Sequence, residues 1–490
     1  MSGQRNKSIK NLAIIAGIIL ASLLIGYLTD SMTLVTDILT AVGLLLVGIT
    51  ILVTVHELGH FLTAKAFGMR VETFSIGFPP KLFSFTRGET EYQIGATPLG
   101  GYVKISGIID ESLDTEHLAG PPKPYEFRAK PVWQRLIVMT GGVIMNVILG
   151  VLIFTGLKWT YPDIHLPAEE VKYGVEVLPN VESLGSMIGL QTGDSIVSIN
   201  GRTYPYIDDY RNNAFLLEDD AYFEVYRNNE LVKLNVPGNI QNFFGSDTIS
   251  RVLFLVDAPP IIDVIDSIKD ADENFYQLPA SKAGLQDGDE ILLVDSLSVP
   301  LFSDMRNLIR ARADKPVNIL FKRGPDTMSV VVQVSEEGRI GIDRDLVNIF
   351  NFDTVHHDLD TAFILGTKAA FGVLSANIQG FKNLGKEGVD ASKSVVGPLQ
   401  IGKFFLDSFR NYGLEGFFRL TGMLSMILAL VNILPIPALD GGHVVFLLIE
   451  AITRKEPSPK VRIIAQQIGM VLILGLMLLI LFNDTFRLFS

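Results

Sequence analysis

The sequence predicts a multi-pass α-helical membrane protein with a large β-rich block outside the membrane. Three observations lead to this fold class. Of the 490 residues, 48% are hydrophobic, which is too many for a soluble protein of this length. The hydrophobic residues gather in five stretches long enough to cross a bilayer. Between the third and fourth stretches lies an acidic region with an internal repeat, as expected for folded domains outside the lipid.

The five apolar stretches are the predicted spans. They cover residues 12–28, 38–64, 136–157, 417–434 and 463–482. Arg5, Lys7 and Lys10 precede the first stretch, as basic residues precede a signal peptide. No good cleavage site with small residues follows it, so we expect a retained helix.

The distribution of basic residues predicts the orientation. Lys and Arg gather at the N-terminus, in 65–135 and between the last two spans, whereas the 29–37 connection and the acidic block at 162–416 fall on the opposite side. Because basic loops stay in the cytoplasm, we expect a cytoplasmic N-terminus and an extracytoplasmic block. The chain is therefore expected in the bacterial inner membrane, with this block in the periplasm or otherwise outside the cytoplasm.

Composition excludes several functions. A net charge of −12 argues against nucleic-acid binding. The chain has no cysteine, which excludes disulfides, iron–sulfur clusters and cysteine-ligated zinc. Any bound metal must therefore be held by His, Asp or Glu.

The strongest chemical signal is the run His56-Glu57-Leu58-Gly59-His60 near the end of the second predicted span. Two histidines four residues apart project from one helix face and can bind one zinc ion through their imidazoles. The Glu after the first His can take the proton of the metal-bound water during attack on a carbonyl. Ionisable residues at membrane depth are costly and are functional by default. The motif therefore predicts peptide hydrolysis inside, or at the edge of, the bilayer.

Asp440 is the predicted third zinc ligand. The second and fourth spans both run from outside to inside, so their C-terminal ends reach the same leaflet. Asp440 follows the fourth span, after Pro435 and Pro437 have broken the helix. Two imidazoles and one carboxylate would leave the fourth zinc position open for water.

The acidic block repeats one motif. Gly-Leu-Gln-Thr-Gly-Asp at 189–194 reappears as Gly-Leu-Gln-Asp-Gly-Asp at 284–289, and an apolar strand and a hairpin follow both copies. This pattern resembles PDZ domains, which bind an extended peptide at a sheet edge and often capture its C-terminal carboxylate. The alternative is a pair of spacers without a ligand; we favour binding or steric gating of substrates.

Residues 74–104 predict short strands on the cytoplasmic side. The segments 81–86 and 91–96 flank a turn at Arg87-Gly88, and a further strand follows at 99–105. Open sheet edges cannot face lipid. The sheet could dip toward the site if its edge pairs with a substrate strand, and an ordinary cytoplasmic hairpin is the equal alternative on pattern alone.

Together these motifs resemble the site-2 protease family of intramembrane zinc metalloproteases. The matching segments are His56 to His60, Gly-Gly-Tyr-Val at 100–103, the two PDZ-like repeats, Gly-Pro-Leu at 397–399, and Asn432 to His443. The first helix at 12–28 is an addition to the family pattern, and Pro79 stands where the family often has Gly.

The resemblance implies a role for each motif. It implies His56, His60 and Asp440 as zinc ligands and Glu57 as the catalytic base. The residues that it implies for substrate binding are Asn432, Gly101, Tyr102 and Val103. It makes the 74–104 region a membrane-reentrant sheet, and it implies substrates that are single-pass membrane proteins already trimmed by another protease, such as anti-sigma factors and remnant signal peptides. The PDZ pair would exclude substrates with bulky outer domains.

We therefore expect six regions. They are an extra transmembrane helix (1–35), a catalytic membrane region (36–160), two PDZ-like domains (161–256 and 257–345), a connector with amphipathic segments (346–416) and a C-terminal membrane region (417–490).

Two other functions remain as alternatives. The chain could be an inactive membrane scaffold that gathers partners through its PDZ pair, although the intact Glu57 argues against this. It could be a transporter, but the membrane segments show no paired halves. Asn146 in the third span could contact the helix that bears the His pair, and His443 could act behind Asp440; for both we favour a packing or structural role.

Overall fold

The computed structural model describes residues 32–489 apart from 109–120, 179–182, 212–214, 217, 219, 239, 241–251, 266, 270–274 and 384–396. The described residues form two compact units. One contains the chain up to Tyr161 and from His357 onward, and the other contains Pro162–His356. The predicted helix at 12–28 lies outside the described residues.

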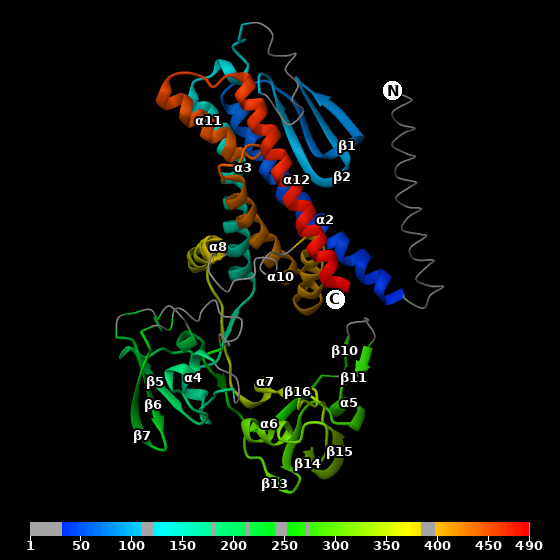
Figure 1. Ribbon diagram of the computed structural model, residues 1–490, viewed down its shortest axis with the longest axis vertical. Coiled ribbons are helices and arrows are strands. Elements are labelled where there is room, and N and C mark those ends of the chain that lie inside the picture. The colour runs from blue at the N-terminus through cyan, green and yellow to red at the C-terminus, as the bar shows by residue number, and fades with distance from the viewer. Residues whose placement is uncertain are drawn as a thin grey trace. The chain divides into compact units, whose positions relative to one another are not determined.

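Helices dominate the first unit (Figure 1). They are α2 (Met32–Ala66), α3 (Val132–Thr160), α8 (Leu359–Asn383), α10 (Pro398–Asn432), α11 (Asp440–Thr453) and α12 (Pro459–Phe489). All of these except α11 are long and apolar enough to cross a membrane. The prediction of a multi-pass membrane protein with β domains is confirmed at this level.

Small residues allow α2 and α3 to pack closely. A β-carbon on Gly59 would lie 2.2 Å from the carbonyl oxygen of Gly141, and one on Gly141 would lie 2.7 Å from the carbonyl oxygen of Gly59. The two backbones therefore touch, as is common where membrane helices associate. This contact lies one residue before His60, so it brings α3 directly against the face of α2 that carries His56 and His60.

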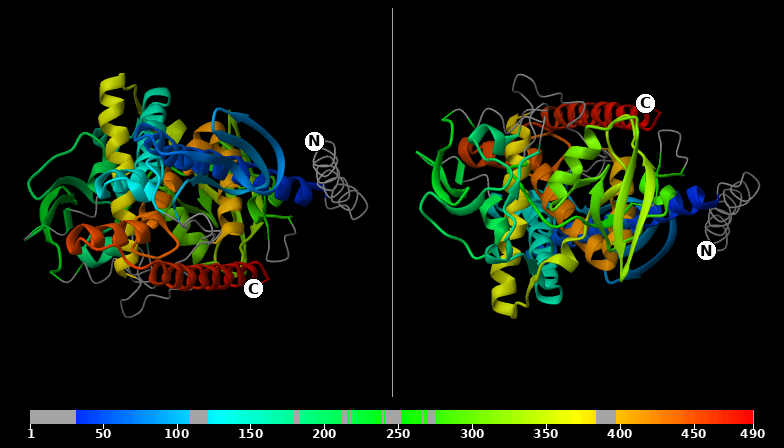
Figure 2. Two further views of the ribbon diagram at one scale, coloured as in Figure 1. Left: turned by 90° about the horizontal axis from the view of Figure 1, so that it is seen from above. Right: turned by 90° about the horizontal axis from the view of Figure 1, so that it is seen from below.

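Three helices differ from the sequence-based expectation. The segment between the last two spans was expected to be a loop, which is wrong, because residues 440–453 form α11. The connector contains α8, which Figure 1 shows nearly end-on and Figure 2 shows lengthwise, so it lies across α3 rather than along it. The fourth span also begins earlier than expected, since α10 extends back to Pro398 through a bend at Gly413, where φ is 57°.

The sheet of the first unit consists of two long strands, β1 (Val71–Arg87) and β2 (Thr90–Ile105). The predicted hairpin at Arg87-Gly88 is confirmed. Phe74 of β1 pairs with Tyr92 on one side and with Val103 on the other. The first and last parts of the long strand β2 therefore flank β1 on its two sides, so β2 forms two of the three rows of the sheet. Residues 101–105 form an outer row, and among the described residues no other strand pairs with its free edge.

The second unit is built mainly of strands. They are β3 (Asp163–His165), β4 (Val175–Glu176), β5 (Ser195–Ile199), β6 (Tyr222–Arg227), β7 (Glu230–Asn235), β8 (Leu255–Val256), β9 (Ile261–Val264), β10 (Ser267–Lys269), β11 (Phe275–Gln277), β12 (Asp289–Val294), β13 (Leu297–Ser298), β14 (Pro316–Arg323), β15 (Asp326–Gln333), β16 (Ile342–Arg344) and β17 (Asp353–Val355). The helices are α4 (Leu184–Ile188), α5 (Pro279–Ala283), α6 (Phe302–Arg310) and α7 (Leu346–Ile349). Two hydrophobic cores fill this unit, one around Phe223 and one around Ile319.

The repeat folds the same way in both copies. In each, a short helix ends at a left-handed glycine, a turn follows, and a strand pairs with a hairpin. Asp194 is buried in the first copy and receives two hydrogen bonds from the Arg227 guanidinium. Asp289 is buried in the second copy and receives the same two bonds from Arg323. The Asp of the motif therefore fastens the turn to the hairpin.

A buried carboxylate joins the two repeats within this unit. Glu176 of β4 is paired with Arg306 of α6 at 2.8 Å and with Arg344 of β16 at 2.6 Å. Arg344 also donates a hydrogen bond to the carbonyl of Val256. The first copy thus holds the second through an ion pair that is shielded from solvent.

Candidate metal and substrate site

The two motif histidines lie on one face of α2. His56 and His60 are both buried, and their Nε2 atoms stand 3.2 Å apart. Their spacing of four residues places one imidazole a turn above the other. Glu57 lies between them in sequence, and its side chain lines a cavity that both histidines also border.

Asp440 reaches this pair from the start of α11. Its Oδ2 atom lies 3.1 Å from Nε2 of His56 and 3.3 Å from Nε2 of His60. Ligand atoms of a tetrahedral zinc ion, at zinc distances of about 2.0–2.1 Å, stand about 3.3 Å apart. The three side chains therefore lie at the separation that one zinc ion requires.

The hydrogen bonds around the histidines also favour a cation. Nδ1 of His60 lies 2.8 Å from the carbonyl oxygen of Val138, which can only accept, so this nitrogen carries the proton. A neutral His60 then points the lone pair of Nε2 at the Asp440 carboxylate. Two facing lone pairs repel unless a cation lies between them, and Oδ2 of Asp440 has no hydrogen-bond partner among the described residues. The donor set thus fits a divalent metal ion.

Glycines bring Asp440 into position. After α10 ends at Asn432, the chain turns sharply and enters α11. A β-carbon on Gly441 would lie 2.1 Å from the carbonyl oxygen of Leu434, and one on Gly442 would lie 2.6 Å from that of Ile436. Only glycine allows the first turn of α11 to pack against this turn, and Asp440 heads that helix.

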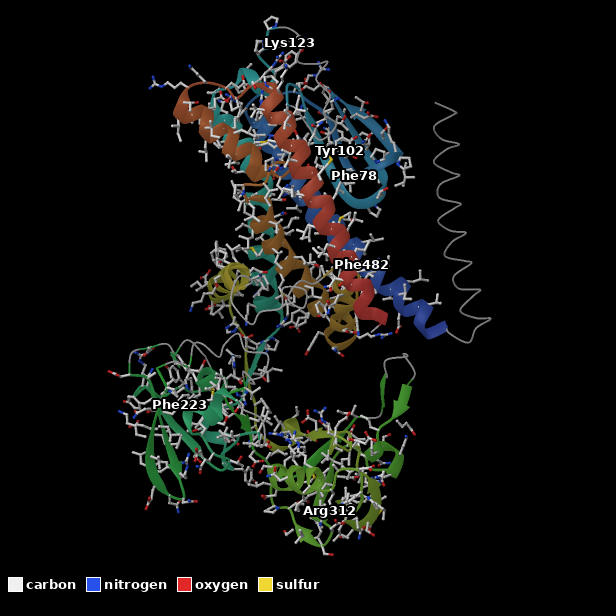
Figure 3. The ribbon with its side chains drawn as sticks, viewed as in Figure 1. Phe78, Tyr102, Lys123, Phe223, Arg312 and Phe482 are labelled. Atoms are coloured by element: carbon white, nitrogen blue, oxygen red, sulfur yellow. The ribbon has the colours of Figure 1, made fainter. Side chains whose placement is uncertain are left out.

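The predicted substrate residues line the same space. A cavity of about 620 Å³ is bordered by the three candidate ligands and Glu57, and also by Asn432, Gly101, Tyr102 and Val103. The amide nitrogen of Asn432 lies 3.4 Å from Nε2 of His56. A β-carbon on Gly101 would lie 3.2 Å from Cγ of Glu57. The free edge of β2 therefore passes beside the candidate base, and Figure 3 shows Tyr102 and Phe78 on this sheet.

The structure adds two residues that sequence reasoning did not assign to the site. Gly142 of α3 lies against both imidazoles, and Asn146, one turn further, lies 3.1 Å from Nδ1 of His56. The sequence pattern alone favours a packing role for Asn146. One feature of the sequence could have assigned them to the site: Gly142 and Asn146 are four residues apart, as are His56 and His60 on the facing helix.

The remaining histidines take no part in this cluster where they are described. His443 lines the cavity but is not among the converging ligands. His165 stacks on Tyr206 in the second unit, with ring centroids 4.5 Å apart. His117 lies outside the described residues.

Comparisons with known proteins agree with this chemistry. A family model described as "Peptidase family M50" matches residues 44–476. The chain is 29% identical to a Xylella fastidiosa protein named "Putative zinc metalloprotease", over 91% of this chain and 99% of that protein. It is 26% identical to the "Regulator of sigma E protease" of Haemophilus influenzae, over 92% of this chain and 99% of that protein. It is 28% identical to the protein of the same name from Salmonella typhimurium, over 90% and 98%.

Proposed function

The chain belongs to peptidase family M50, and on that premise we propose that it cuts the membrane-spanning segments of single-pass membrane proteins. It is a zinc metalloprotease, as the family and its relatives are. The observation that carries the proposal is the convergence of His56, His60 and Asp440 beside Glu57 in a cavity of the helical unit.

We assign the metal site to His56, His60 and Asp440. These three side chains would hold a zinc ion, which would supply Lewis-acid chemistry for the scissile carbonyl and for the attacking water. Glu57 accepts the proton of that water and passes it to the amide nitrogen of the departing peptide.

The free edge of β2 is the proposed binding place for the substrate. A spanning helix must unwind before its carbonyls can reach a metal, and an extended segment can then pair with the edge at Gly101–Val103 as an added strand. This pairing gives hydrogen-bond partners to the N–H and C=O groups of the unwound substrate, which lipid cannot provide. Asn432, on the other side of the cavity, offers an amide to the substrate backbone. In this proposal the β1–β2 sheet dips into the membrane.

The charge pattern supports an orientation. Lys65, Lys81, Arg87, Lys104 and Arg462 flank the metal-site ends of the spans, and positive residues stay in the cytoplasm. The cut would then fall in the cytoplasmic leaflet of a bacterial inner membrane. The second unit, with its acidic surface, would lie outside the cytoplasm.

The two repeats are proposed to be PDZ-like domains. The second has a groove of about 480 Å³ between α6 and the edge strand β16. Its charged lining residues are Glu337 and four basic ones, of which Arg306 is paired with Glu176; the other three are Lys282, Arg310 and Arg339. A strand edge beside a basic groove suits an extended peptide with a free carboxylate, such as the new terminus left by an earlier cut. The same pair would hinder substrates with bulky outer domains.

The substrate class follows from the relatives. Several are named regulators of sigma E, so we propose anti-sigma factors that another protease has already shortened, together with remnant signal peptides. The lipid bilayer is the medium of the reaction.

The test uses the purified full chain in lipid with a shortened single-pass substrate. Wild-type protein should contain about one zinc per chain and cleave. Glu57→Gln should keep zinc and lose cleavage by about 1,000-fold or more, while His56→Ala loses both. Glu72→Gln makes the same chemical change on β1 and should remain active. Cleavage that survives Glu57→Gln would overturn the mechanism, whereas zinc-loaded wild-type protein that does not cleave would leave the scaffold alternative. Membrane fragments trapped by Glu57→Gln would identify the substrates.

A further inference from the structure

One face of α3 supplies partners to both candidate histidine ligands. Val138, Gly142 and Asn146 are spaced four residues apart, so they form a row along the helix. The carbonyl of Val138 accepts from Nδ1 of His60, and the amide of Asn146 lies 3.1 Å from Nδ1 of His56. Between them, Gly142 makes room for the two imidazoles. Each histidine of α2 therefore has its own partner in this row, Val138 for His60 and Asn146 for His56.

The two partners differ in chemistry. An imidazole that offers the lone pair of Nε2 to a metal must carry its proton on Nδ1, and that proton needs an acceptor. For His60 the acceptor is a backbone carbonyl, which no substitution removes. At His56 the neighbouring group is the buried side-chain amide of Asn146, whose Nδ2 faces Nδ1 of the ring in this structure and whose Oδ1 has no hydrogen-bond partner among the described residues.

We propose that Asn146 is a positioning residue for zinc, which accepts a hydrogen bond from Nδ1 of His56 and so fixes the ring with Nε2 toward the metal. The inference rests on the proposed zinc site. The oxygen and nitrogen of a side-chain amide exchange places on a half-turn, so Asn146 can present either to the ring. When the nitrogen faces Nδ1, His56 holds its proton on Nε2, which lies 3.1 Å from Asp440. The amide of Asn146 can thus bond to Nδ1 of His56 in both states, through its nitrogen without the metal and through its oxygen with it.

Asn146 is itself held in place. The hydroxyl of Ser425 on α10 donates a 2.7 Å hydrogen bond to the backbone carbonyl of Asn146. This bond ties the turn of α3 that carries the amide to a third helix. A buried amide costs stability unless it is used, and an apolar side chain of equal size would fill the same space. Packing alone therefore does not account for an amide at this position.

The test compares two substitutions of similar size. Asn146→Asp keeps an acceptor oxygen toward His56, whereas Asn146→Leu keeps the volume and removes the acceptor. Thr421→Val is the control, because it removes another fully buried polar group in the same helix bundle that bonds only its own helix in the described contacts. Each variant is purified as the full chain, and its zinc affinity is measured by competition with a chelator. The absorption spectrum of the cobalt-loaded protein reports the ligand geometry.

We expect Asn146→Leu to weaken zinc binding by about 10- to 100-fold and to alter the cobalt spectrum. Asn146→Asp should bind at least as tightly as wild type, and Thr421→Val should be unchanged. Equal losses for Asp and Leu, or wild-type affinity for Leu, would overturn the inference. If Asn146→Leu does not fold, Asn146→Asp decides alone, since a tenfold loss there contradicts an acceptor role. Wild-type protein that binds no zinc would instead overturn the proposed function.

Discussion

Gly142 of α3 lies so close to His56 of α2 that a β-carbon on the glycine would stand 2.5 Å from Cε1 of the imidazole. The same β-carbon would lie 2.6 Å from Nε2 of His60. Both distances are shorter than any ordinary contact between these atoms. The absence of a side chain at this one position therefore lets α3 approach the histidine pair closely enough to support it.

Adding one methyl group at this glycine is expected to destroy the metal site. In Gly142→Ala either the imidazoles turn away or α3 withdraws, and both changes separate the candidate ligands. We expect zinc bound per chain to fall below about one tenth of wild type, since ligand geometry tolerates little displacement. Metal analysis of the purified protein measures this. Gly156→Ala lies in the same helix, meets no atom within 4 Å, and should keep its zinc.

The outer row of β2 offers a test of substrate positioning. A β-carbon on Gly101 would lie 2.6 Å from the carbonyl of Ser75 and 3.2 Å from Cγ of Glu57. Gly101→Ala should push the strand edge away from the base, and a shift of about 1 Å can cost about 100-fold in rate. We expect kcat/KM to fall by about that factor while zinc content stays at wild type. Loss of zinc along with activity would mean that the glycine supports the metal site instead.

The repeated ion pair predicts matched losses of stability. Hydrogen bonds from Arg323 to Asp289 raise the pKa of that guanidinium, and bonds from Arg227 to Asp194 do the same in the first copy. Removing either Arg leaves a buried carboxylate without its partner, at a cost of about 1–3 kcal/mol. Arg323→Ala should therefore speed hydrogen exchange in β12 and β14, and Arg227→Ala in β5 and β6.

Each variant serves as the other's control, because the two ion pairs lie in separate cores. Lys322→Ala removes an exposed neighbouring cation and should leave exchange in both copies unchanged. Faster exchange in both copies after a single Arg substitution would show that the repeats unfold together, as the bridge from Glu176 would allow.

Stability of the second repeat should depend on pH through Asp263. Partial loss of solvation, and then repulsion from Asp345, Asp287 and Asp343, raise the pKa of this carboxyl above its usual range. Asp343 pairs with it directly across β9 and β16. A raised folded pKa means that the folded state holds the proton more tightly, so stability falls as the pH rises through that pKa.

Asp263→Asn should therefore stabilise this repeat at pH 7 by about 0.2–1 kcal/mol. The gain should shrink as the pH falls toward the ordinary aspartate value of about 3.9, because the wild-type carboxyl is then protonated. Hydrogen exchange of β9 and β16, corrected for the intrinsic effect of pH, measures the difference. A benefit that is the same at both pH values would contradict the electrostatic cause.

The sequence predicted the metal cluster well because its logic is local or topological. The spacing of His56 and His60 gives one helix face. The expected parity of the spans predicts Asp440 at the same depth as the pair, and in the structure its carboxylate lies beside both imidazoles. The roles of these residues in binding zinc stay a prediction.

Other features could not be read from the sequence because they depend on tertiary contacts. The sequence analysis did not predict a helix after the two prolines, and the need of Gly441 and Gly442 for close approach to the backbone of Leu434 and Ile436 appears only in the structure. The amide of Asn146 meets His56 only because glycines bring α3 against α2. The Asp of each repeat looked like a turn residue, and its Arg partner lies on a hairpin far along the chain.

The proposed metal site is discontinuous in sequence. Between His60 and Asp440 lie 379 residues, and the carboxylate meets the imidazoles only where the start of α11 reaches α2. In the proposed function, a partly folded chain would therefore lack its third ligand, so that tertiary folding and zinc binding would be coupled.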